Sequence, residues 1–227
     1  AGSVQVNGVE CRTRKNDFYE SIGVDFEFST LYEKLTAREN LKLFASLYQN
    51  TACDINKLLA SVGLSKDADK KISSFSKGMK SRCNFIKALL HVPDLLCLDE
   101  PTSGLDPANS RLMKDRILEE KQKGKTILLT THNMEDATEL CDRVAFIVNG
   151  HICALDTPHN LIMSKGARRV TYTWEEEGEQ QAVCPMDTLS CDTQLQRLIA
   201  ENRLLSIHSS EPTLNDIFLD ITGRTLV

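Results

Sequence analysis

Two short apolar runs, over residues 95–98 and 127–129, are the features that most constrain the fold of this chain. Continuous apolar runs of this length are typical of strands that are buried on both faces of a parallel sheet. Between them, residues 108–123 carry apolar side chains at helical spacing, and Gly124 follows as a helix-ending signal. Because such strand–helix–strand connections join parallel strands in a right-handed crossover, the sequence predicts an α/β protein with a parallel sheet.

Polar residues follow both predicted strands. Asp99 and Glu100 come directly after the first strand, and Thr130, Thr131 and His132 come after the second. The carboxyl ends of parallel strands lie at one edge of a sheet, where open α/β sheets bind their ligands. We therefore expect two carboxylates and an imidazole to converge at that edge.

Local patterns predict further elements in the first part of the chain. Asn7-Gly8 is a hairpin turn signal between two short strands. Thr36 and Glu39 have the form of a capping box at the start of a helix. Other elements are expected over residues 22–28 (a strand), 53–62 and 77–91 (helices).

The pattern changes after Arg143. A hairpin signal at Asn149-Gly150 comes first, and residues 166–227 then combine strand and helix patterns, ending in a helix with Thr213 as its N-cap. The sequence therefore predicts a main α/β domain over residues 1–165 and a small α+β appendage over residues 166–227.

Composition argues against several classes of protein. The 27 basic and 32 acidic residues give a net charge of −5, which argues against binding to nucleic acid through bulk charge. No run of ~18 apolar residues is present, so we expect no segment to span a bilayer. The eight cysteines include no CxxC pair and are expected to be unpaired thiols in a reducing cytosol.

Four short motifs occur in a fixed order along the middle of the chain. They are FSKGM at 75–79, LLCLDEP at 95–101, SGLD at 103–106 and TTH at 130–132. In this order and spacing they resemble the signature loop, Walker B strand, D-loop and switch histidine of the ATP-binding subunits of ABC transporters. The resemblance implies a P-loop NTPase-type parallel sheet core with a helical signature subdomain over about residues 36–92.

The resemblance also implies roles at the strand ends. Asp99 would organise Mg²⁺, and Glu100 would act as general base for, or would position, the water that attacks the γ-phosphate of ATP. His132 would contact that phosphate. Asp106 would help to link two nucleotide sites across a dimer.

The signature loop would serve a nucleotide held by another subunit. Ser76, Lys77, Gly78 and Met79 lie where a helix begins, and such an N-terminus offers N–H groups and the positive end of the helix dipole to a phosphate. In the family this phosphate belongs to ATP on the opposite subunit, so the resemblance implies a head-to-tail dimer on ATP binding. The alternative for Ser76 is a helix N-cap and nothing more.

Glu27 departs from the family's pattern. Alignment of the residues on either side places Glu27 where the family has a glutamine that touches Mg²⁺ and senses the membrane partner. A carboxylate can also hold Mg²⁺, but its charge disfavours nucleotide unless the metal screens it. We expect Glu27 to be a second metal ligand, with an altered rate or a weakly active site as the alternative.

One motif of a nucleotide-binding domain is missing. Gly124-Lys125-Thr126 looks like the end of a GxxxxGK[ST] phosphate loop, but Glu119 stands where its first glycine belongs. This GKT also closes a predicted helix and enters a strand, whereas a phosphate loop leaves a strand and begins a helix. We therefore expect the true loop to precede Ala1, and we expect the 227 residues by themselves to be inactive.

The resemblance implies an ATP-binding and ATP-hydrolysing subunit that powers an ABC transporter, with ATP and Mg²⁺ as cofactors. The ending over residues 211–224 is similar to that of bacterial exporters of drugs, antibiotics or lipids, whose membrane subunits are separate chains. The expected partners are a second ATPase subunit and a transmembrane permease, without nucleic acid, at the cytoplasmic face of the membrane. The alternative is a nucleotide-incompetent regulatory or partner-binding module.

Overall fold

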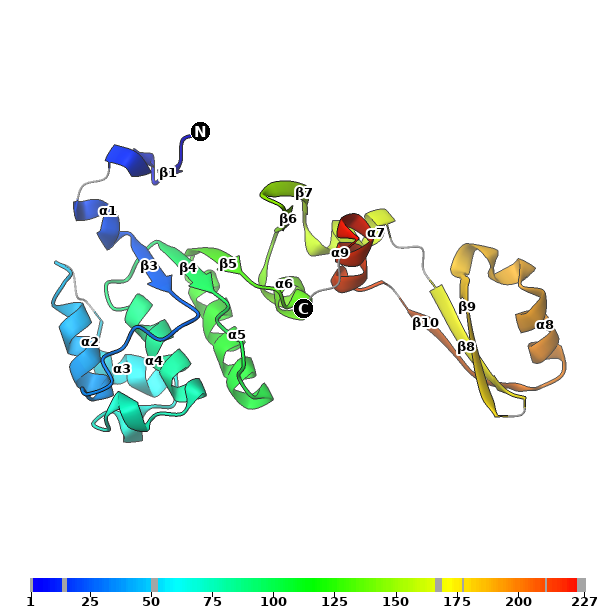
Figure 1. The fold of residues 1–227 in the computed structure, drawn as a ribbon, viewed down its shortest axis with the longest axis horizontal. Coiled ribbons are helices and arrows are strands. Elements are labelled where there is room, and N and C mark those ends of the chain that lie inside the picture. Colours follow the sequence, from blue (N-terminus) through cyan, green and yellow to red (C-terminus); the bar gives the residue numbers. More distant parts are fainter. Residues whose placement is uncertain are drawn as a thin grey trace. The chain divides into compact units, whose positions relative to one another are not determined.

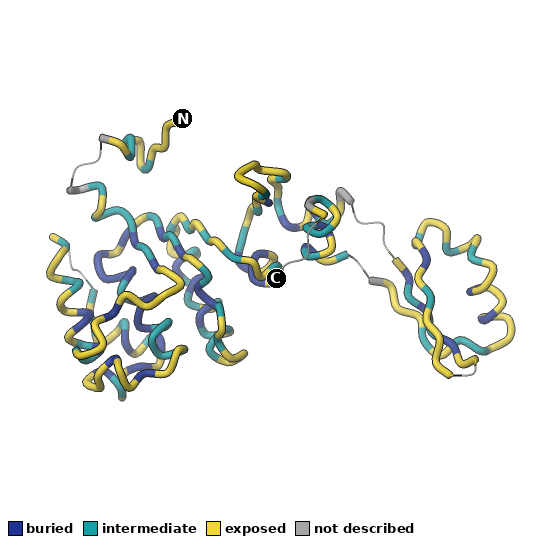
Figure 2. The backbone as a smooth tube through the Cα atoms, viewed as in Figure 1, coloured by how far each residue is buried: buried dark blue, intermediate teal, exposed yellow. Residues whose placement is uncertain are grey.

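The computed structural model describes residues 2–13, 16–49, 53–165, 169–176, 178–210 and 212–223 (Figures 1 and 2). The chain divides into two compact units, Ala1–His132 and Asn133–Val227. The first unit contains a three-stranded parallel sheet, whereas the strands described in the second unit pair only in antiparallel fashion.

A parallel sheet forms the centre of the first unit. Its strand order is β3 (Ile22–Asp25), β4 (Leu95–Asp99), β5 (Thr126–Thr130). Helix α5 (Pro107–Gln122) leads from β4 to β5, so the predicted parallel strand–helix–strand unit is confirmed (Figure 1). Asp99 pairs with Thr130 in the register of these two strands. The polar residues that follow β4 and β5 therefore lie at the same edge of the sheet.

Strand β5 is less buried than its sequence predicts. Leu96 and Leu98 of β4 are fully buried, but Leu128 of β5 is 60% exposed. The expectation that residues 127–129 are buried on both faces is therefore wrong. The reason is that β5 lies at the edge of the sheet formed by the described residues, where a strand is covered on fewer sides than the central one.

Three helices pack together in the first unit: α2 (Ala37–Ala45), α3 (Ile55–Ser61) and α4 (Lys77–Ala88). The predicted capping box is confirmed, because Thr36 Oγ1 accepts a hydrogen bond from Glu39 N and the Glu39 carboxylate accepts one from Thr36 N. Figure 2 shows the long buried stretch along α4. The shorter elements are β1 (Gln5–Val6) and β2 (Val9–Glu10), which form the predicted hairpin, and η1 (Cys11–Thr13), α1 (Asn16–Glu20), η2 (Ser65–Asp67) and η3 (Ile72–Ser74).

Two elements end earlier than predicted. Strand β3 stops at Asp25 rather than at residue 28, because side-chain hydrogen bonds from α4 hold the segment that follows. Helix α4 stops at Ala88 rather than at residue 91. The helix cannot continue to residue 92, because Pro93 disfavours helical backbone at Val92, whose φ is 51°.

A first core of the second unit surrounds a hairpin. Helix α6 (Met134–Leu140), strands β6 (Val144–Val148) and β7 (His151–Asp156), α7 (Pro158–Lys165) and α9 (Leu214–Thr222) share this core. Its buried residues are Ala137, Phe146, Leu161, Leu214 and Ile217. Thr213 caps α9 as predicted, by accepting a hydrogen bond from Asp216 N at 3.2 Å.

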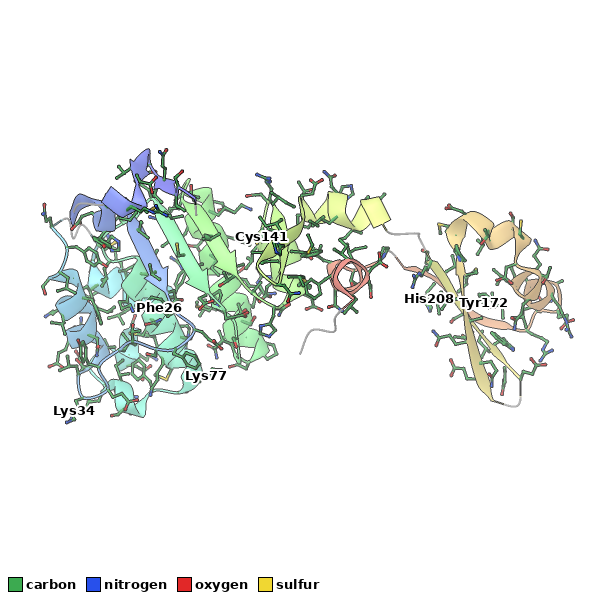
Figure 3. All side chains as sticks on the ribbon, turned by 45° about the horizontal axis from the view of Figure 1, so that its top comes forward. Phe26, Lys34, Lys77, Cys141, Tyr172 and His208 are labelled. Carbon is green, nitrogen blue, oxygen red and sulfur yellow. The ribbon has the colours of Figure 1, made fainter. Side chains whose placement is uncertain are left out.

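The rest of the second unit is an α+β layer. Strand β8 (Arg169–Glu175) is central between β10 (Leu204–Ser210) and β9 (Glu179–Pro185), and helix α8 (Thr193–Ala200) and η4 (Met186–Cys191) complete the layer. Its buried residues are Val170, Tyr172, Trp174, Cys184, Leu195 and Leu198. Tyr172 and His208, labelled in Figure 3, lie on the neighbouring strands β8 and β10. The domain boundary near residue 165 stays a prediction, since α9 shares the first core.

Two further predictions concern the whole chain. None of the helices in the described part of the chain has both the length and the apolar character needed to cross a bilayer. All eight cysteines lie in the described part and are free thiols.

Candidate functional site

A pocket of about 340 Å³ lies at the carboxyl edge of the parallel sheet. Its walls come from the segment after β3, the start of α4 and the segment after β4. Three of the residues predicted for the site line it, namely Glu27, Lys77 and Glu100. Phe26, labelled in Figure 3 together with Lys77, also lines the pocket. The fold thus gathers side chains that are far apart in the sequence.

Glu100 and His132 converge at this edge, as expected from the parallel pairing of β4 and β5. Oε1 of Glu100 accepts hydrogen bonds from the backbone nitrogen and from Nδ1 of His132, both at 2.8 Å. Thr131 Oγ1 donates to the other carboxylate oxygen at 3.2 Å. The carboxylate is largely buried, with 18% of the Glu100 side chain exposed, whereas 60% of the His132 side chain is exposed. A fixed acid and a solvent-facing ring therefore stand next to each other.

The backbone of Glu100 is strained. Its φ is 47°, in the left-handed region that side chains other than glycine rarely occupy. The conformation is held in place by a hydrogen bond from Glu100 N to Thr130 O at 2.9 Å. Such strain costs about 1–3 kcal/mol and is found mainly at functional sites.

Asp99 lies at the end of β4 and is exposed. Thr130 Oγ1 donates a hydrogen bond to its carboxylate. Within the described residues, no three His, Cys, Asp or Glu side chains gather in a way that would hold a metal ion. Mg²⁺ commonly takes only one or two protein carboxylates and completes its shell with phosphate oxygens and water. The exposed carboxylates of Asp99 and Glu27 fit that chemistry, although only Glu27 lines the pocket.

The signature loop forms the start of α4. Ser76 is its N-cap, since Ser76 Oγ accepts a hydrogen bond from Met79 N at 3.2 Å. Lys77 extends over Gly104, where a Cβ built on the glycine would lie 2.1 Å from Lys77 Nζ. Gly104 also has a φ of 64°, so its backbone conformation favours glycine, whereas the Lys77 side chain could move aside. Gly78 approaches the 102–109 segment from the same helix turn.

Asp106 caps helix α5 and is connected to the signature loop. Its carboxylate accepts hydrogen bonds from the backbone nitrogen of Asn109, at 3.0 Å, and from the Asn109 side-chain amide. These bonds, the side-chain bond first, lower the pKa of Asp106. The Asn109 amide in turn lies beside Gly78, 3.3 Å from where a Cβ on that glycine would be. The Asn109 amide thus bonds to Asp106 and lies against Gly78 of the signature loop.

Sequence reasoning missed a buried polar pair behind the pocket. Asn84 Nδ2 donates to Asp25 Oδ1 at 2.5 Å, and both residues line the pocket. Burial raises the pKa of Asp25 to about 7, and the bond from Asn84 and the nearby Lys87 only partly oppose that effect. The sequence held one signal for this pair. Asp25 in the predicted strand and Asn84 in the predicted helix are polar residues at positions where the hydrophobic pattern predicts apolar ones.

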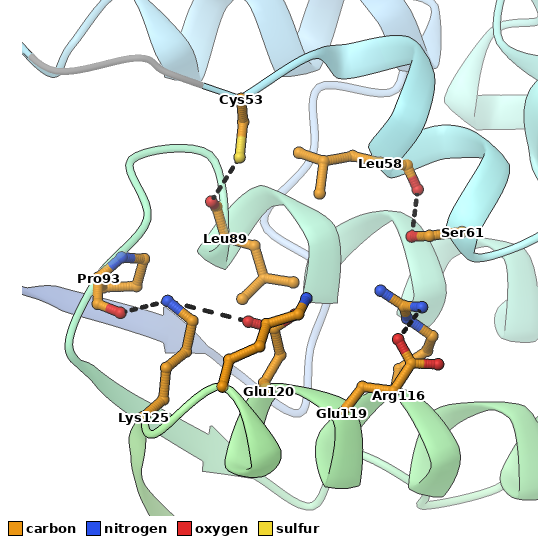
Figure 4. Close-up of polar contacts among 10 residues, drawn as sticks. Cys53, Leu58, Ser61, Leu89, Pro93, Arg116, Glu119, Glu120 and Lys125 are labelled. Carbon is orange, nitrogen blue, oxygen red and sulfur yellow. Dashed lines mark hydrogen bonds and ion pairs between the residues drawn. The ribbon is translucent and has the colours of Figure 1, made fainter.

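A second cavity of about 640 Å³ lies between α3, the last part of α5 and the turns that precede β4 and β5 (Figure 4). Lys125 Nζ donates to Pro93 O at 2.5 Å, and lies 3.8 Å from Glu120 Oε2. Gly124 and Lys125 lie between α5 and β5, which confirms that the GKT sequence closes a helix and enters a strand. Lys125 is therefore engaged in a local ion pair.

Comparisons with known proteins identify the family. Residues 1–103 match the family model described as ABC transporter. The chain is 48% identical over 212 residues to a fluoroquinolones export ATP-binding protein of Mycobacterium tuberculosis, covering 92% of this chain and 70% of that one. It is 35% identical to the Nod factor export ATP-binding protein I of Rhizobium meliloti (99% and 72% covered). It is 31% identical to a linearmycin resistance ATP-binding protein of Bacillus subtilis (100% and 82% covered).

Solved structures agree with this assignment. The ATP-binding subunit of an ABC transporter aligns with a TM-score of 0.65 and 30% identity, over 72% of this chain and 70% of that chain. A dimeric ATP-binding cassette in a post-hydrolysis state, bound to ADP and Pi, aligns with a TM-score of 0.61 and 22% identity, over 69% and 73%, and shows the same fold. The chain therefore belongs to the ATP-binding subunits of ABC transporters, a family of ATPases.

Proposed function

We propose that this chain drives an exporter whose transport path is a separate membrane-spanning subunit. The relatives named above act in fluoroquinolone export, Nod factor export and linearmycin resistance, which supports export of a drug, antibiotic or lipid-like cargo. A permease partner would place the chain at the cytoplasmic face of the membrane. The observation that carries the catalytic part of the proposal is the hydrogen-bonded pair of Glu100 and His132.

In this proposal Glu100 activates or orients the water that attacks the γ-phosphate. Its carboxylate accepts a proton from the water, or orients it, as the γ-phosphate is transferred. The donors at His132 and Thr131 hold the carboxylate in one orientation. Because Nδ1 of His132 is bonded to Glu100, Nε2 of this mostly exposed ring would be the atom that contacts a phosphate oxygen.

Asp99 would hold Mg²⁺, with Glu27 as a second ligand. Both carboxylates are exposed near the ends of neighbouring strands, which supports a site shared with nucleotide phosphates. The ion would supply the positive charge that neutralises the phosphates during transfer. Glu27 then acts as a ligand only when the ion is bound, since otherwise its own charge opposes phosphate.

The signature loop would act on a second subunit's nucleotide in a head-to-tail dimer. Ser76 caps a twelve-residue helix that begins with Lys77, Gly78 and Met79, and the N–H groups and dipole at this end favour an anion. Lys77 would add a full positive charge. Asp106, linked to this turn through Asn109, would relay the state of one site to the other.

The decisive experiment compares ATP hydrolysis by the full-length protein with that of Glu100→Gln. We expect the substitution to reduce the rate by about 10²–10³-fold with ATP binding retained, since it removes the base but leaves the charge-binding groups. Glu119→Gln, an acid on α5 outside the pocket, is the matched control and is expected to hydrolyse ATP normally. Unchanged turnover in Glu100→Gln would exclude the catalytic role. A full-length protein that fails to bind ATP–Mg²⁺ would favour the regulatory module instead.

A further inference from the structure

Asn84 is a polar residue in the buried part of α4. Its neighbours in the helix, Cys83, Phe85 and Ile86, are apolar and fully buried, and Asn84 itself is only 1% exposed. A buried amide without partners costs about 1–3 kcal/mol on the scale of mutational data. Its presence at this position therefore needs an explanation in its contacts.

Both ends of the Asn84 amide are hydrogen-bonded, to the last residue of β3, to the segment that follows it and to Lys87 of α4. Its Nδ2 donates to Asp25 Oδ1 at 2.5 Å and to Phe26 O at 3.2 Å. Its Oδ1 accepts from Thr30 N at 3.4 Å and from Thr30 Oγ1 at 3.2 Å. Lys87 Nζ, one helical turn along, also donates to this oxygen, at 3.0 Å, and contacts Thr30 Oγ1.

These partners fix the orientation of the amide. Two acceptors face its NH₂ group, and three donors face its oxygen. A flipped amide would set like against like at every contact except the one with the Thr30 hydroxyl, which can also accept. These bonds hold both ends of the segment 26–30, which belongs to no helix or strand. Glu27 lies between the two bonded ends and lines the pocket with Glu100.

We propose that Asn84 is a positioning residue, which clamps residues 25–30 onto α4 and thereby places the Glu27 carboxylate at the pocket. This inference rests on the metal-ligand role proposed for Glu27. In this proposal Asn84 acts through Glu27 and not by its own contact with nucleotide or metal. It acts because its amide bonds both ends of the segment that carries Glu27 to the helix that carries the signature loop, with Lys87 adding a contact at Thr30.

The first test is hydrogen–deuterium exchange in the full-length protein without nucleotide. Asn84→Ala should speed exchange in residues 26–31 about tenfold, as expected for the loss of bonds to a charged group. Asp25→Ala should do the same, whereas Asp25→Asn keeps an acceptor for Asn84 Nδ2 and should restore slow exchange. Cys83→Ala, at the adjacent buried position, is the matched control and should leave residues 26–31 unchanged. Thr30→Val, at an exposed residue, provides a second variant should Asn84→Ala not fold. It removes the bond from Thr30 Oγ1 to Asn84 Oδ1 and the contact with Lys87 Nζ but keeps the other Asn84 bonds, so it should speed exchange by about three- to tenfold.

The second test separates positioning from general stability. In hydrolysis, Asn84→Ala should raise the Mg²⁺ concentration for half-maximal rate by about tenfold, as is typical when support for a metal ligand is removed. Cys83→Ala should not raise it. Equal exchange in Asn84→Ala, Thr30→Val and wild type, or an equal effect from Cys83→Ala, would overturn the inference. A wild-type protein that exchanges as expected but does not hydrolyse ATP would instead contradict the proposed function alone.

Discussion

One oxygen of Glu100, Oε1, lies 2.8 Å from both the backbone nitrogen and the ring Nδ1 of His132. The backbone bond fixes the carboxylate whatever residue occupies position 132. The bond from Nδ1 requires a histidine at position 132. It connects the largely buried Glu100 carboxylate to the mostly exposed His132 ring. The two contributions can therefore be separated by substitution.

His132→Ala removes the ring and keeps the backbone N–H. We expect ATP hydrolysis to fall by about 10²–10³-fold, the usual cost of removing one donor from a charge-stabilising site. ATP binding, measured by titration with a fluorescent analogue, should change little. Thr131→Val removes the longer bond to the Glu100 carboxylate, at 3.2 Å, and should cost much less. Comparable rates in His132→Ala and wild type would show that the ring is dispensable.

Ser76 has two possible roles that a pair of variants can separate. Ser76→Ala loses the N-cap of α4 and should lower the free energy of unfolding by about 1 kcal/mol. Ser76→Asp keeps the cap but directs a negative charge toward a phosphate, so it should retain stability and still lose most hydrolysis. Urea denaturation and steady-state hydrolysis provide the two measurements. Thr213→Ala, which removes the cap of α9, is the control for stability loss with normal hydrolysis. Full activity in Ser76→Asp would leave Ser76 as a cap only.

Val92 occupies a backbone conformation that suits it poorly. Its φ is 51°, a genuine outlier for a β-branched residue, and half of the side chain is exposed. Val92→Asn should raise the free energy of unfolding by about 1 kcal/mol, because asparagine tolerates the left-handed region. The exposed Val4 has no positive φ, so Val4→Asn should change stability by less than about 0.5 kcal/mol. Equal urea midpoints for Val92→Asn and wild type would count against strain at this turn.

Much of the fold follows from one-dimensional patterns. The apolar run before Asp99, the helix after Pro107 and the handedness of their connection predict the parallel pairing of β4 and β5, and that pairing alone brings Glu100 and His132 together. The capping boxes at Thr36 and Thr213 are equally local, because each bonds residues three positions apart. Local sequence patterns thus predict the helices and strands, and they predict the sheet edge at which the carboxyl ends of β4 and β5 meet.

Other features depend on contacts between distant residues. Asp25 and Asn84 are separated by 59 positions, so neither the strand nor the helix pattern indicates that they share a hydrogen bond. The low burial of Leu128 depends on which strand lies at the edge of the sheet, and not on its own apolar run. The positive φ of Glu100 is likewise imposed by tertiary contacts, since nothing in the motif LDEP demands it.

His91 should make the stability of the protein sensitive to mild acid. The ring is buried and stacks on Tyr48 with 3.8 Å between ring centroids, and its Nε2 donates to Ile22 O at 2.9 Å. Its Nδ1 is buried and has no partner among the described residues, so a second proton there would be an unpaired charge. Burial therefore lowers the pKa of His91, and the bond to Ile22 only partly opposes this.

Because the pKa of His91 is lower in the folded state than its ordinary value of 6.5, the unfolded chain takes up this proton first as pH falls. The stabilising contribution is present above pH 6.5 and is lost as pH falls from there through the folded-state pKa. We expect the free energy of unfolding, from urea titrations at pH 7.5 and 5.5, to drop more in wild type than in His91→Gln. Glutamine can still donate to Ile22 O but does not titrate, and all other histidines and carboxylates are shared by the two proteins. Parallel losses in both proteins would show that another group governs the acid response.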